Sequence, residues 1–88
     1  MDSKASQDAA AAFERAEREA PTRRVAVIVT LRDWARRSDV VRAGLAVTHE
    51  AEHGNIVMGT VTGEEGRRVA ALDAVELIEL DGTFSLID

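Results

Sequence analysis

The chain has 88 residues, enough for one domain, and 45% of them are hydrophobic but only 3% aromatic, which predicts a core of Val, Ile, Leu and Ala. A net charge of -5 argues against a nucleic-acid partner, and the absence of cysteine excludes disulfides and thiolate metal sites. No apolar run approaches the roughly 20 residues that span a membrane, so no membrane partner is expected.

The N-terminal sequence has no basic region followed by an apolar stretch, which is the pattern of a secretory signal peptide. This predicts a cytoplasmic protein. Secretion is the alternative that stays open, because a leader that has been removed leaves no trace in the sequence.

Residues 1–22 differ in composition from the rest of the chain. Ser6 is suited to cap a helix, Asp8 falls in its first turn, and an Ala-rich run extends to Ala20, just before Pro21. The apolar stripe of this run is thin and contains one large side chain, Phe13. We therefore expect residues 1–22 to form a helical or partly disordered extension that docks loosely, with a partner-binding helix as the alternative.

Residues 23–88 read as alternating strands and helices. The run 24–31 is β-branched and apolar on both faces, as a central strand is. Asp33 is expected to cap a helix that carries Trp34 and ends at Gly44, and Thr62 with Glu65 has the spacing of a capping box that opens a second helix. Further strands are expected at residues 45–48, 56–61 and 75–80.

This order, βαββαβ, predicts an α+β fold of the ferredoxin-like kind, a four-stranded antiparallel sheet with both helices on one face. The opposite face would then have no cover. By alternation it would present Ile28, Met58 and Leu77, with Glu79 and Asp81 as an acidic rim. An exposed apolar patch of this kind is typical of a partner surface. The alternatives are that the N-terminal helix folds over it or that it forms a homodimer.

The segment His49-Glu50-Ala51-Glu52-His53 matches the H-E-x-x-H pattern of zinc proteases. That chemistry requires both histidines on one helical face. Here the segment continues a predicted strand and runs into the turn at Gly54, and on a strand the two histidines would lie about 13 Å apart. We therefore predict no metal, no cofactor and no catalytic residue, and a chain that is not an enzyme.

Together the motifs of residues 24–87 resemble the subtilisin propeptide family and its free-standing proteinase inhibitors. The similarity begins with the Val-Ile-Val strand at 27–29 and with residues 39–47, where a helix end is followed by a glycine and a strand. It continues with Met58-Gly59-Thr60-Val61 and with the helix at 69–72. The last matching motif is Val75-Glu76-Leu77-Ile78-Glu79-Leu80-Asp81-Gly82.

The resemblance implies a protein that docks the open face of its sheet against a subtilisin-like serine protease and acts as its inhibitor or folding chaperone. Glu79 and Asp81 match the acidic side chains with which such domains cap helices of the protease. The tail, residues 83–88, would lie in the substrate cleft as an added strand, with Ile87 in the S1 pocket or, one register further, Asp88. Its side chains would be Phe84, Ser85, Leu86, Ile87 and Asp88.

Two other functions stay open from the sequence. One is a ferredoxin-like interaction module that binds a partner other than a protease. The other is a homodimerising or ligand-binding regulatory domain of the same topology.

Overall fold

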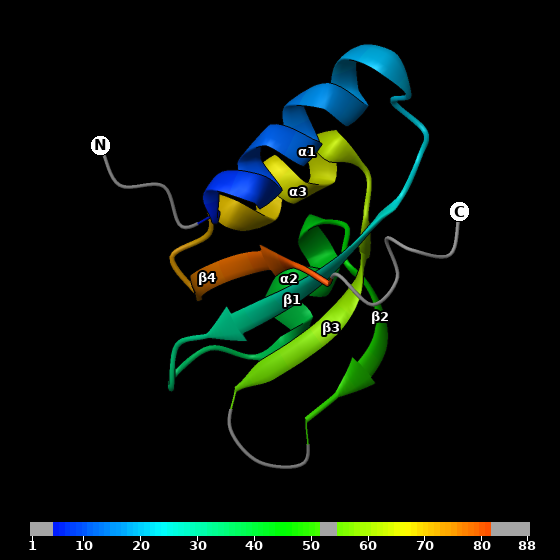
Figure 1. The fold of residues 1–88 in the computed structure, drawn as a ribbon. Helices are drawn as coiled ribbons and strands as arrows, with labels where there is room; N and C mark the ends of the chain where they lie inside the picture. Colours follow the sequence, from blue (N-terminus) through cyan, green and yellow to red (C-terminus); the bar gives the residue numbers. More distant parts are fainter. Residues whose placement is uncertain (1–4, 52–54, 82–88) are drawn as a thin grey trace.

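The computed structural model describes residues 5–51 and 55–81. Its elements are α1 (Gln7–Glu19), β1 (Val25–Leu31), α2 (Arg37–Ala43), β2 (Ala46–Glu50), β3 (Ile56–Val61), α3 (Gly63–Ala70) and β4 (Val75–Leu80) (Figure 1). The strands form one sheet in the order β2-β3-β1-β4, and every neighbouring pair is antiparallel. The predicted α+β fold with a four-stranded antiparallel sheet is confirmed, and the elements that follow α1 have the predicted order βαββαβ.

Alternation along the strands places one set of side chains against the helices. In β1 the buried residues are Val27, Val29 and Leu31, and in β3 they are Val57, Gly59 and Val61, as the sequence predicts. These strand residues join side chains from all three helices in a single hydrophobic core, including Phe13 of α1, Val40 of α2 and Val69 of α3. The core therefore lies between the helices and one face of the sheet.

Helix α1 is part of this core, and this corrects the expectation of a loosely docked extension. Ser6 caps it as predicted, accepting a hydrogen bond from the Ala9 N–H at 3.2 Å. Phe13 has no exposed surface and rests on α3 where Gly66 leaves room: a Cβ on Gly66 would lie 2.6 Å from the Phe13 ring. The small side chains of this thin apolar stripe allow α1 to lie close to α3.

The residues before α1 anchor it to the sheet edge. Ala5 forms a parallel bridge with Ile78, and the Ser6 N–H donates to the Ile78 carbonyl at 2.9 Å. On the other side an ion pair joins α1 to α3, with Arg67 Nη1 2.6 Å from Glu17 Oε2. The N-terminal helix is thus tied to both β4 and α3.

The start of α2 differs from the prediction. The helix begins at Arg37, and the Arg36 N–H donates to Asp39 Oδ2 at 3.0 Å. Asp33 does not cap it, because its carboxylate accepts a hydrogen bond from Asn55 Nδ2 at 2.8 Å. Trp34 consequently lies in the turn before the helix instead of within it. The predicted end is confirmed: Gly44 has a φ of 122°, a conformation that favours glycine.

We predict that Phe13→Ala lowers the free energy of unfolding by roughly 3–5 kcal/mol, because it removes a fully buried ring from a closed core. Urea denaturation followed by circular dichroism measures the change. The exposed Ala10→Gln on the same helix is the control and should leave stability almost unchanged. Equal stability of the Phe13 variant and the control would show that α1 does not contribute to the core.

Candidate functional site

The sheet face opposite the helices brings the three predicted docking residues together. Met58 lies between His49 of β2 and Ile28 of β1, while Thr30 of β1 pairs with Leu77 of β4. Because Ile28 itself pairs with Glu79, Leu77 lies diagonally across from Ile28 on the adjacent strand. Ile28, Met58 and Leu77 are all half-buried, so each keeps part of its surface accessible.

Helix α1 does not cover this face. It packs on α3, and its Phe13 belongs to the core on the helical side of the sheet. The alternative that the N-terminal helix folds over the open face is therefore wrong. Among residues 5–51 and 55–81, the docking face, defined as Ile28, Met58 and Leu77, has no helix packed against it.

The predicted acidic rim is only partly present. Glu79 is exposed and pairs in register with Ile28, so it borders the docking face. Asp81, in contrast, is only 8% exposed, and its N–H donates to the Ala26 carbonyl at 2.9 Å. The expectation of two accessible carboxylates is therefore not met at Asp81, which is buried. The tail residues Phe84, Ser85, Leu86, Ile87 and Asp88 lie outside the described residues.

His49 and Glu50 lie on β2, an edge strand, and not on a helix. The pairing register of β2 shifts between Val47 and His49, and Glu50 forms an ion pair with Arg37 at the start of α2. His53 lies outside the described part of the chain. Within the described part, no group of three His, Asp or Glu side chains could hold a metal ion, and no helix is long and apolar enough to cross a membrane.

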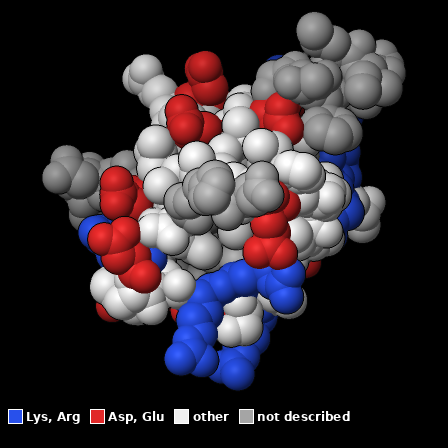
Figure 2. Space-filling view, turned by 90° about the horizontal axis from the view of Figure 1, so that it is seen from below, with Lys and Arg blue, Asp and Glu red and all other residues white. Residues whose placement is uncertain are grey.

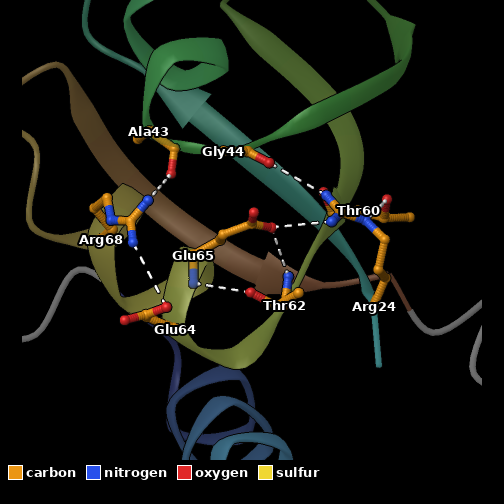
Figure 3. A network of polar contacts seen from close by, with 8 residues as sticks. All are labelled: Arg24, Ala43, Gly44, Thr60, Thr62, Glu64, Glu65 and Arg68. Carbon is orange, nitrogen blue, oxygen red and sulfur yellow. Dashed lines mark hydrogen bonds and ion pairs between the residues drawn. The ribbon is translucent and has the colours of Figure 1, made fainter. Parts of the chain in front are cut away.

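A polar network on Arg24 joins the ends of several elements (Figure 3). Its guanidinium donates to Thr60 Oγ1 at 3.0 Å and to the carbonyls of Thr60 at 2.8 Å and Gly44 at 3.2 Å. It also forms an ion pair with Glu65 Oε1 at 3.1 Å. Arg24 thus ties the start of β1 to β3, to the end of α2 and to α3, and we assign it a structural role.

Glu65 is the centre of the predicted capping box. The Thr62 N–H donates to Glu65 Oε1 at 2.9 Å, and the Glu65 N–H donates to Thr62 Oγ1 at 3.2 Å. The hydrogen bond from the Thr62 backbone holds the pKa of Glu65 below its usual value; burial opposes this shift, and the positive charge of Arg24 adds to it. Gly44 is required beside it, because a Cβ there would lie 2.6 Å from Glu65 Cγ.

A second surface feature was missed by the sequence analysis. A hollow of about 450 Å³ opens between the β1–α2 turn, the two helices α2 and α3, and the turn before β4. Its lining includes Trp34, Arg42, Arg68, Leu72 and Asp73. The sequence signal that could have predicted this hollow is the chain's single tryptophan, which lies among Arg32, Arg36 and Arg37.

Comparison with known proteins finds no matching family model, no similar curated protein and no similar solved structure.

We predict that Glu65→Gln destabilises the fold by about 1 kcal/mol near neutral pH, in the range of a lost helix cap. The lowered pKa means that ionised Glu65 stabilises the fold above the usual glutamate pKa, 4.5, and that this contribution is lost as the pH falls through the lower folded value. The stability difference between the wild type and the variant should therefore shrink in acid.

Urea denaturation at a series of pH values measures this difference. The control is Glu64→Gln on the same turn, an exposed position that should show a small and nearly constant difference. A Glu65→Gln difference that stays the same from neutral to acidic pH would contradict the capping role of the carboxylate.

Proposed function

We propose that the protein is a non-enzymatic binding protein that inhibits or chaperones a subtilisin-like serine protease by docking the open face of its sheet. The observation that carries this proposal is the docking face itself. Ile28, Met58 and Leu77 are neighbours on one face of the sheet, and the described helices pack only against the other face. Apolar side chains left together on an open sheet are typical of a protein-binding surface.

Glu79 supplies the acidic part of the proposed contact. It is exposed at the edge strand β4 and borders Ile28, so a partner that covers the docking face would meet its carboxylate. A carboxylate placed at the N-terminus of a partner helix accepts charge-assisted hydrogen bonds from free N–H groups. Because Asp81 is buried, this capping role is assigned to Glu79.

The tail completes the proposal. In the sequence, residues 83–88 are separated by two residues from the end of β4, the strand that carries Leu77 and Glu79. In the proposed complex they enter the substrate cleft as an added strand, with alternate side chains in successive pockets of the protease.

The same docking face supports a second candidate, a homodimer or a complex with a partner that is not a protease. A face that includes Ile28 and Met58 near the centre of the sheet can also pack on a second copy of itself about a two-fold axis. Light scattering of the purified protein tests this candidate. A dimer that dissociates when Met58 is replaced by a charged residue would support it, provided that the protein has no effect on any subtilisin.

We predict that the wild-type protein slows a broad-specificity subtilisin and that Met58→Asp weakens this inhibition at least about tenfold. A charge placed at the middle of the interface would be buried without a partner. Progress curves of peptide hydrolysis at a series of inhibitor concentrations measure the inhibition constant. Glu79→Lys, an exposed change beside the face, should weaken inhibition as well.

The matched control is Ala11→Asp, which introduces the same charge at an exposed position of α1. It should inhibit like the wild type. Equal inhibition by the Met58 and Ala11 variants would exclude the docking face from the contact, and no inhibition by the wild type of several subtilisins would overturn the protease proposal.

We further predict that removing residues 83–88 leaves the unfolding curve nearly unchanged but removes most of the inhibition. In the proposed complex the tail alone occupies the substrate cleft, whereas the described core lies within residues 5–78. Thermal unfolding and the same progress curves measure the two effects. A truncated protein that inhibits as well as the full chain would contradict the role of the tail.

A further inference from the structure

The edge strand β2 adds His49 to the open side of the sheet. His49 is exposed and pairs in register with Met58 of β3. Directly paired residues of antiparallel strands share a face, so the two side chains lie beside each other. The next residue, Glu50, forms an ion pair with Arg37 of α2 on the helical side, as alternation along a strand requires. His49 therefore belongs to the same face as Met58.

His49 stands at one end of a row of side chains that crosses all four strands. Met58 pairs with His49 on one side and with Ile28 on the other, and Ile28 pairs with Glu79. We call His49, Met58, Ile28 and Glu79 the cross-strand row. Its two central side chains are apolar and half-buried, whereas both ends are exposed. The ends are chemically complementary, because an imidazole N–H can donate a hydrogen bond to a carboxylate.

The rest of this face carries little charge. The other outward positions of the two central strands are uncharged: Ala26, Thr30, Ile56 and Thr60. Asp81 is buried, and Arg24 at the start of β1 is already paired with Glu65. In Figure 2, by contrast, Lys and Arg side chains gather toward the lower side of the view and Asp and Glu side chains form separate groups. Two copies of a chain with a net charge of -5 repel each other least where such charges are few.

A two-fold axis parallel to the strands, midway between β1 and β3, makes the cross-strand row complementary to itself. This axis reverses the row in the second copy, so Met58 faces the second copy's Ile28 and His49 faces the second copy's Glu79. It also keeps the strands of the two sheets aligned, as in most face-to-face packings. An axis along the row would instead place each Glu79 opposite its own copy, and facing like charges oppose association.

We propose that a second copy of the chain occupies the docking face, with the two cross-strand rows antiparallel. Met58 packs on the second copy's Ile28, and His49 donates a hydrogen bond to the second copy's Glu79. Two-fold symmetry makes each of these contacts twice. The inference rests on the docking face of the proposed function and specifies its second candidate, so a protease and a second copy would compete for this face.

The size of the face predicts a weak dimer. The four strands are five to seven residues long. With strands about 4.8 Å apart and about 3.3 Å per residue, the face covers roughly 400 Å². This is about half of the ~800 Å² that each partner contributes to a stable complex. We therefore expect a dimer that dissociates on dilution.

The test mixes two variants that each oppose the pairing. His49→Glu places a carboxylate opposite the second copy's Glu79, and Glu79→Lys removes the acceptor for the second copy's His49. Each variant alone should dimerise at least about tenfold more weakly than the wild type. In a mixed dimer the new glutamate faces the new lysine, and the unchanged His49 faces the unchanged Glu79. The equimolar mixture should therefore associate at least about tenfold more tightly than either variant alone.

Sedimentation equilibrium between about 10 µM and 1 mM measures these dissociation constants. The matched controls are Ala11→Glu and Glu14→Lys, which introduce the same new charges at exposed positions of α1. Each control should dimerise nearly as the wild type does, and their mixture should gain nothing. Net charge alone does not predict a gain for the first pair, because the mixture has only the average charge of its components. Circular dichroism checks that all four variants are folded.

The proposal is overturned if the wild type stays monomeric at about 1 mM, or if His49→Glu and Glu79→Lys each dimerise like the wild type. It is also overturned if mixing these two variants gives no gain, or if the control pair gains equally. No protease is present in this test. Failure of the dimer is therefore read separately from failure of subtilisin inhibition.

Discussion

The close contact between α1 and α3 is the constraint on which the rest of the structure depends. Among the described residues Phe13 is the largest fully buried side chain, and its ring occupies space that only a glycine at position 66 leaves open. Gly63 is restricted in the same way, since a Cβ there would collide with the backbone of α1. Because this contact holds α1 on the helical side, none of the described helices covers the opposite face of the sheet.

The network on Arg24 and Glu65 fixes the other half of the helical layer. One guanidinium binds groups on β3, on α3 and at the end of α2, so segments separated by up to 41 positions, from Arg24 to Glu65, are held at one point. This joint also keeps α2 beside α3, and that arrangement forms the hollow next to Trp34. The hollow thus lies in the helical layer, and the docking face lies on the opposite side of the sheet.

Local patterns predicted much of this fold correctly. The alternation of β1 and β3 determined which side chains meet the helices, because successive residues of a strand point to opposite faces. Thr62 and Glu65 close a capping box within one turn, and Gly44 ends α2 through its own backbone conformation. The candidate docking residues Ile28 and Met58 followed from the same alternation, although their contact required the strand register.

The sequence by itself determined the elements, their order and the inward face of each strand, since these depend on side chains a few positions apart. Only the tertiary structure decided where α1 packs, that Asp81 is buried and that Trp34 lies exposed beside Arg42 and Arg68. The partner of Phe13 is a glycine 53 positions later, and the partner of the Asp33 carboxylate is Asn55, 22 positions later. Contacts of this length leave no periodic signal in the chain, because they depend on how helices and strands pack and not on the repeat of any one of them.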